Sequence, residues 1–255
     1  MVTPGQKRTG EDDKEDENEI TGAEATKYRA MVARAIFLAQ DRTDIAYAVK
    51  ELSRRMAKPR TKDMKNLKRL GRYLIGKERA VVKFNRQSRT GLVNVWTDTD
   101  YAGCVETRKS TSGGLIMLGQ HMVKSWSNTQ SVLALSSGEA EYYGMVGGAS
   151  IGIGVRGLLE DLGVRTRIRV STDSSAAMGI SKRRGLGKVR HIELNQLWLQ
   201  DKVTKGEVEV RKINGDDNIA DALTKHIDQK KIGQHMSSSG QEIRTGRHVL
   251  APNAE

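Results

Sequence analysis

The stretch VNVWTDTDYAG, residues 93–103, decides how the chain is interpreted, because it predicts a strand that ends on acidic side chains. Apolar and polar residues alternate from Leu92 to Asp98, as they do in a strand with one buried face. Acidic residues are disfavoured in strands, so Asp98 is a candidate functional group. Asp100 lies two residues further on and is expected on the same face of the strand.

The chain after this strand alternates between strand and helix patterns, in an order typical of an α/β domain. Two strands joined by a tight turn come first, and a long helix follows. The expected elements are strands at 112–118 and 121–126, a helix at 137–162, a strand at 167–172, helices at 174–181 and 191–205, a strand at 207–213 and a helix at 216–226.

Composition divides the chain into four parts. We expect an acidic disordered linker at 1–24, a basic helical segment at 25–89, the α/β domain at 90–229 and a flexible tail without periodicity at 230–255. The formal net charge is +12, and residues 51–90 carry fourteen Lys or Arg against three acids. Such a segment suits a polyanion such as nucleic acid, although a solvated surface or a membrane-facing patch would have the same composition.

Cysteine content and hydropathy further limit the class of protein to which the chain can belong. Cys104 is the single cysteine, so an internal disulfide framework is impossible, and a reducing compartment, cytoplasmic or nuclear, is expected. No apolar run approaches the roughly 20 residues of a membrane-spanning helix. The sequence also lacks the apolar region of a secretory signal peptide.

Four carboxylates occur where predicted strands end or helices begin: Asp98, Glu139, Asp173 and Asp221. Hydrolysis of a phosphodiester by two metal ions needs acids that converge from separate elements, and Mg²⁺ prefers carboxylate and water ligands. Each acid also has an ordinary explanation. Glu139 suits the first turn of a helix, Asp173 suits a turn or cap, and Asp221 suits a solvated helix surface. Their joint placement is therefore more informative than any one of them.

Taken together, these motifs resemble the ribonuclease H domain of copia-type LTR retrotransposon Pol polyproteins. The upstream helices resemble the segment that connects reverse transcriptase to ribonuclease H in the same polyproteins. The matching motifs are WTDTDYAG (96–103), TRKSTSGG (107–114), ALSSGEAEYYG (134–144), STDSSAA (171–177), RHIELNQLWLQDKV (190–203) and NIADALTK (218–225), with YRAMVARAIFLAQDRTDIAYAVKELSRRM (28–56) and LKRLGRYLIG (67–76) upstream.

The resemblance implies a five-stranded mixed sheet with flanking helices, preceded by a small helical segment. It also implies that the four acids named above bind two Mg²⁺ ions, for which Mn²⁺ can substitute. The activity implied is cleavage of the RNA strand of an RNA/DNA hybrid, leaving a 5′ phosphate and a 3′ hydroxyl. RNA/DNA hybrid or RNA is the implied partner, together with the polymerase part of the polyprotein. The chain has no YxDD-type polymerase motif of its own.

Seven basic residues are candidates for contacts with nucleic acid. The basic helices would hold phosphates and set the register of the hybrid. A solvated turn explains the pair at 108–109 equally well, and the histidine suits a structural or substrate-facing role better than a catalytic one. The candidates are Lys65, Lys68, Arg69, Arg72, Arg108, Lys109 and His191.

The main alternative is a non-catalytic, domesticated ribonuclease H-like module that binds nucleic acid or scaffolds a larger ribonucleoprotein assembly. Five glycines between 144 and 154 favour it, because each glycine costs up to about 1 kcal/mol in a helix interior and together they predict a kinked or weak helix. Retention of all four acids opposes it. An integrase-like strand-transfer domain is disfavoured, because the acids follow the ribonuclease H order along the chain.

Overall fold

The computed structural model describes residues 3–6, 18–187, 192, 196–246, 248 and 250. The chain forms two compact units. One comprises residues 1–83 together with 226–255, and the other comprises residues 84–225. The C-terminal residues therefore belong with the N-terminal helices, whereas the segment between them folds on its own sheet.

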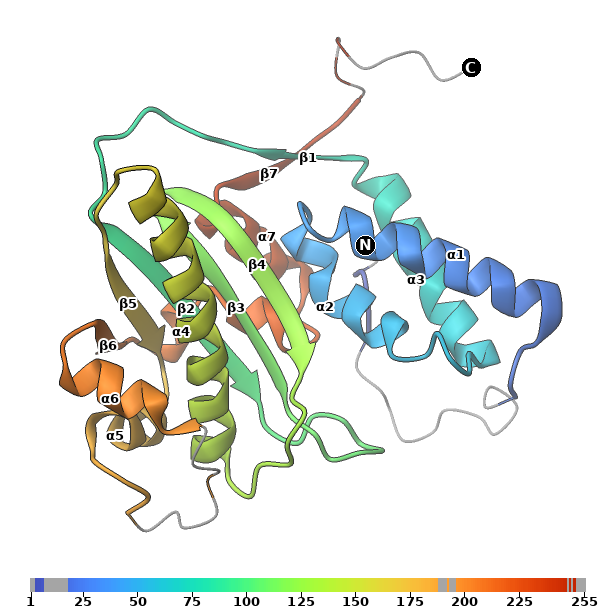
Figure 1. Cartoon of the computed structure of the whole chain (residues 1–255). Coiled ribbons are helices and arrows are strands. Elements are labelled where there is room, and N and C mark those ends of the chain that lie inside the picture. The colour runs from blue at the N-terminus through green and yellow to red at the C-terminus, as the bar shows by residue number, and fades with distance from the viewer. Residues whose placement is uncertain are drawn as a thin grey trace. The chain divides into compact units, whose positions relative to one another are not determined.

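A five-stranded mixed sheet forms the centre of the second unit, as the sequence predicted (Figure 1). Its spatial order is β4-β3-β2-β5-β6. β2 pairs with β3, and β3 with β4, in antiparallel fashion, whereas β2 with β5, and β5 with β6, are parallel. The bounds are β2 (Leu92–Asp100), β3 (Thr111–Leu118), β4 (His121–Thr129), β5 (Arg167–Thr172) and β6 (Val208–Lys212).

The helix α4 (Ser137–Asp161) lies along one face of this sheet, with the shorter helices α5 (Ser175–Lys182) and α6 (Trp198–Thr204) nearby (Figure 1). The apolar core lies between α4 and the sheet. Its members include Val95, Ile116, Ile168 and Val170 from the strands, and Tyr142, Met145 and Ala149 from the helix.

The glycines of α4 explain why this helix is continuous rather than kinked, contrary to the expectation from composition. Gly144, Gly148 and Gly152 recur every four residues and lie against the sheet. A Cβ atom on Gly148 would lie 2.5 Å from Thr97 Cγ2, and one on Gly152 would lie 2.8 Å from Val95 Cγ2. These glycines let the helix backbone approach the strands closely, and that packing offsets their poor helix propensity.

We expect Gly148→Ala to destabilise the protein by about 1–3 kcal/mol, because the added methyl group overpacks a closely filled contact. Gly147 is the matched control, since it is exposed and a Cβ there would meet nothing within 4 Å. Gly147→Ala should be neutral or stabilise by up to about 1 kcal/mol. Urea unfolding of both variants checks the prediction, and equal effects of the two would contradict it.

The helix expected at 216–226 is replaced by two short 3-10 turns, η3 (Gly215–Asp217) and η4 (Asp221–Leu223). The side chain of Asn218 accounts for the difference. Its Oδ1 accepts a hydrogen bond from the Ala220 backbone N–H at 3.1 Å. Such a bond gives the backbone an alternative to a continuous helix.

Three helices form the N-terminal part of the first unit: α1 (Gly22–Leu38), α2 (Thr43–Ser53) and α3 (Thr61–Gly76). Their buried apolar side chains, including Tyr28, Val32, Ile45 and Leu70, form a separate core. None of the helices in the described part of the chain is both long and apolar enough to cross a membrane.

Regular structure continues into the segment that the sequence predicted to be an irregular tail. The helix α7 (Gln229–Ser238) is followed by β7 (Gln241–Arg244), which pairs antiparallel with β1 (Arg79–Val82). The Gln241 amide also donates a hydrogen bond to the Asp41 carbonyl at 2.8 Å. The sequence did not predict β7, because a strand of four residues is too short to show a periodic pattern. Its partner β1 also lies about 160 residues earlier in the chain.

Candidate metal centre and nucleic-acid contacts

Three carboxylates from three different elements of the second unit meet at one edge of the sheet. Asp98 lies near the end of β2, Asp173 directly follows β5, and Glu141 lies in the second turn of α4. Each offers an oxygen atom, and these atoms all lie within 4.8 Å of one another. β2 and β5 are parallel neighbours, so their carboxyl ends bring Asp98 and Asp173 together.

Glu141, which the sequence reasoning missed, lies in this group in place of the predicted Glu139. Glu139 is buried, but its carboxylate is directed to other partners. Its Oε2 accepts a hydrogen bond from the Leu135 backbone N–H at 3.0 Å, and its Oε1 accepts one from the Tyr143 hydroxyl at 2.7 Å. The structure therefore corrects the prediction by two residues within the same motif.

The glycines of α4 contain the signal that identifies Glu141. Gly144 and Gly148 mark the side of the helix that faces the sheet. Glu141 precedes them by three and seven residues, which places it on that same side. Glu139 precedes Gly144 by five residues, which is a rotation of roughly 140° around the helix axis.

Glu141 has the most perturbed environment of the three acids. Its Oε2 is buried without a hydrogen-bond partner in the part of the chain that the structure describes. Burial, followed by the charges of Asp98 and Asp173, raises its pKa to about 9, against an opposing hydrogen bond from the Thr99 backbone. A buried carboxylate oxygen without a donor is costly unless it is protonated or bound to a cation.

Opposing effects act on the pKa of Asp98. Burial raises its pKa to about 6, and the charges of Asp221 and Asp173 act in the same direction. The Thr224 hydroxyl donates a hydrogen bond to Asp98 Oδ2 and acts against this shift. Thr224 is fully buried, so its hydroxyl holds the carboxylate in one orientation.

The same C-terminal motif also holds Asp173. The Asn218 Nδ2 group donates hydrogen bonds to Asp173 Oδ2 at 3.3 Å and to the Thr97 carbonyl at 3.0 Å. Asp221, the fourth predicted acid, lies outside the group of three and forms an ion pair with Lys225. Of the four predicted acids, the structure thus brings Asp98 and Asp173 together and leaves Glu139 and Asp221 with other partners.

The donor set fits a hard divalent cation. The three acids supply carboxylate oxygens, which Mg²⁺ and Mn²⁺ prefer over nitrogen or sulfur ligands. The unsatisfied Oε2 of Glu141 is an oxygen that a bound cation would satisfy at this point. Asp98, Glu141 and Asp173 are therefore the residues that could hold a metal ion.

The predicted nucleic-acid contacts lie in both units. Lys65, Lys68 and Arg72 are exposed on α3. Arg69 is also on α3, but its guanidinium donates to the Thr3 carbonyl at 3.1 Å and to Gln6 Oε1 at 2.9 Å.

The remaining predicted contacts lie beyond α3. Arg108 and Lys109 are in the loop between β2 and β3, where the exposed Arg108 has a positive φ of 55° and its backbone N–H donates to the Cys104 carbonyl at 2.7 Å. His191 lies outside the described residues.

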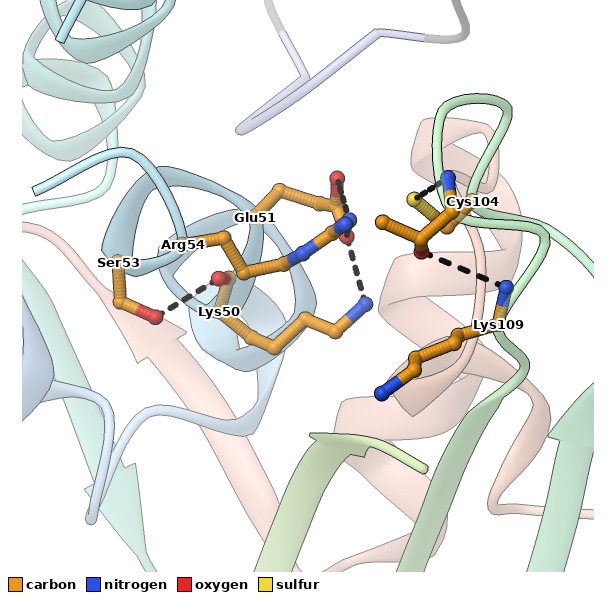
Figure 2. Close-up of polar contacts among 7 residues, drawn as sticks. Lys50, Glu51, Ser53, Arg54, Cys104 and Lys109 are labelled. Atoms are coloured by element: carbon orange, nitrogen blue, oxygen red, sulfur yellow. Dashed lines mark hydrogen bonds and ion pairs between the residues drawn. The ribbon is translucent and has the colours of Figure 1, made fainter. Parts of the chain in front are cut away.

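Some basic side chains of the first unit already have acidic partners. Figure 2 shows Glu51 of α2 bound by two neighbours, with Lys50 Nζ at 2.6 Å and Arg54 at 3.3 Å. Burial acts to raise the pKa of Glu51, but these two cations hold it below its usual value. The positive charge of α2 is thus partly neutralised by its own acid.

The sheet order, the long helix on its face and the acidic group at the ends of β2 and β5 define a ribonuclease H-like domain. Relatives that match most of the chain specify the family. It is 31% identical over 218 residues to the "Retrovirus-related Pol polyprotein from transposon RE1" of Arabidopsis thaliana, and 30% identical over 193 residues to that from transposon TNT 1-94 of Nicotiana tabacum. These matches cover 84% and 75% of the chain. The chain belongs to the family of copia-type retrotransposon Pol polyproteins and corresponds to a region of them.

The chain spans about 15% of the length of these curated relatives. No protein-family model matches it. Among solved structures, the chain is similar to LC11-RNase H1, determined in complex with RNA/DNA hybrid. The identity is 14%, the TM-score is 0.35, and the match covers 52% of this chain and 93% of that one.

Proposed function

We propose that this domain is a Mg²⁺-dependent endoribonuclease that cleaves the RNA strand of RNA/DNA hybrids. The observation that carries the proposal is the convergence of Asp98, Glu141 and Asp173 within 4.8 Å, from β2, α4 and the end of β5. Membership of the copia-type Pol family supports it, because the motifs of this chain resemble the ribonuclease H domain of those polyproteins.

The residues at this centre have two different roles. Asp98, Glu141 and Asp173 would hold the cation, while Thr224 fixes the Asp98 carboxylate and Asn218 fixes that of Asp173. A divalent cation bound there supplies a water of lowered pKa and stabilises the charge that develops on the leaving oxygen. Selection of RNA would come from contacts with 2′-hydroxyl groups across the wide minor groove of the hybrid.

Cleavage of a labelled RNA/DNA hybrid tests the proposal. We expect cleavage that requires Mg²⁺ or Mn²⁺ and is lost in Asp98→Asn and in Asp173→Asn. These substitutions keep the shape of each side chain but remove its charge, and circular dichroism would verify that the variants fold. Tight hybrid binding by the native chain without metal-dependent cleavage would instead support the non-catalytic module. Three of the five glycines between 144 and 154 no longer favour that module, because Gly144, Gly148 and Gly152 pack against the sheet.

We expect the exposed cations of α3 to bind the hybrid through its phosphates. Replacing Lys65, Lys68 and Arg72 with Ala should weaken binding and flatten the plot of log affinity against log salt, because each lost phosphate contact contributes about 0.7–0.9 to its slope. A variant with Lys27, Lys230 and Lys231 changed to Ala loses the same charge from α1 and α7. An unchanged slope in the α3 variant, or an equal change in both, would exclude α3 from the interface.

A further inference from the structure

Lys225 introduces a positive charge beside the acidic centre of the second unit. Its Nζ forms an ion pair with Asp221 Oδ1, four residues earlier in the chain. Its charge also acts on Asp98 and Glu141, and the charge of Asp100 acts on Lys225 in turn. The lysine side chain is about half exposed, at 48%, whereas that of Asp221 is 25% exposed.

This arrangement separates the acids into two sets. Asp98, Glu141 and Asp173 form a group of three that could hold one divalent cation. Asp221 would be available to a second cation, but Lys225 already compensates its charge. The ammonium group ends a flexible four-carbon stem on a side chain that is about half exposed, so it can leave Asp221 without disturbing the backbone.

We propose that Lys225 competes with the second divalent ion for Asp221, so that the two ions bind with unequal affinity. The inference rests on the proposed function and on the two ions that the family resemblance implies. The first ion binds at Asp98, Glu141 and Asp173, and the second binds only when Lys225 releases Asp221. Removal of the Lys225 charge favours the binding of protons to the acids as well as the binding of a divalent ion. The effect on the divalent ion is about twice the effect on a proton at the same place, because the ion carries twice the charge. Proton uptake therefore does not cancel the gain in metal affinity.

Calorimetric titration of the full chain with Mn²⁺ tests this proposal without any measurement of cleavage. The native chain and Lys225→Arg, which keeps the charge, should bind one ion tightly and a second more weakly. Lys225→Gln should tighten the second site by roughly tenfold and the first by less, because charges closer to one another interact more strongly. In an Asp221→Asn background the effect of Lys225→Gln on the second site should disappear, as a double-mutant cycle requires when one residue acts through the other.

The possible failures are distinguishable. If the first ion binds to the native chain but Lys225→Gln leaves the second affinity within twofold of the native value, the competition is overturned and the proposed function is untouched. If Lys225→Gln still tightens the second site in the Asp221→Asn background, the proposal that Lys225 acts through Asp221 is overturned. If neither the native chain nor Lys225→Gln binds Mn²⁺, the metal centre itself, and with it the proposed function, is overturned.

Discussion

Glu141→Gln is expected to reduce Mg²⁺-dependent cleavage of an RNA/DNA hybrid by at least about 100-fold, more than the 10- to 100-fold typical for loss of a residue that only supports a metal ligand. The substitution keeps the size of the side chain but removes the charge that faces Asp98 and Asp173. It should also weaken Mn²⁺ binding, measured by calorimetry, since the group loses one of three carboxylate ligands.

Glu139→Gln is the matched control, two residues away on the same helix. Glu139 accepts hydrogen bonds from the Leu135 N–H and the Tyr143 hydroxyl. Disturbing these buried bonds should cost about 1–3 kcal/mol of stability, but Mn²⁺ affinity should stay within a few-fold of the native value. The assignment would be reversed if Glu139→Gln lost metal binding while Glu141→Gln retained it.

The outcome at these two glutamates shows what the sequence can and cannot predict about the site. The motif ALSSGEAEYYG correctly places an acid at the start of the long helix. The choice between Glu139 and Glu141 depends on which side of the helix faces the sheet. Local capping preferences favour Glu139, whereas the spacing of Gly144, Gly148 and Gly152 favours Glu141 once these glycines are understood as packing contacts.

The strands show the same division between local and long-range information. Alternation of apolar and polar residues predicts β2. The five-stranded mixed sheet followed from the resemblance and is confirmed. The pairing of β7 with β1 could not be predicted, because neither four-residue strand carries enough pattern and the partners are far apart in sequence. Asp221 lies outside the group of three, although its charge acts on Asp98. Its partner Lys225 lies four residues later in the chain, a spacing at which the expected helix would also allow an ion pair.

The metal-free protein is expected to lose stability as the pH rises from about 4 to about 9. In the folded state the pKa values of Asp98 and Glu141 are raised to about 6 and about 9, from 3.8 and 4.5. Between the unfolded and folded values the native state therefore binds more protons than the unfolded chain, and stability must decrease as the pH increases. The contribution is fully present below pH 4. It is lost progressively while the unfolded chain releases protons that the buried groups still hold, and the loss ends when each buried group ionises at its own folded pKa.

A divalent cation reverses this loss, because it supplies the positive charge that the protons no longer provide, and a ligand bound only by the native state stabilises it. We therefore expect excess Mg²⁺ to raise the melting temperature by several degrees at pH 8 and by little at pH 5, where protons compete for the same oxygens. Glu141→Gln should melt higher than the native chain in EDTA at pH 8, because it removes a carboxyl that the folded state keeps protonated well above its unfolded pKa. The variant should also respond less to Mg²⁺, because it lacks one ligand. Differential scanning calorimetry at the two pH values checks these expectations. A Mg²⁺ response as large at pH 5 as at pH 8, or a variant that melts lower than the native chain in EDTA at pH 8, would show that repulsion among these carboxylates does not govern the stability of the site.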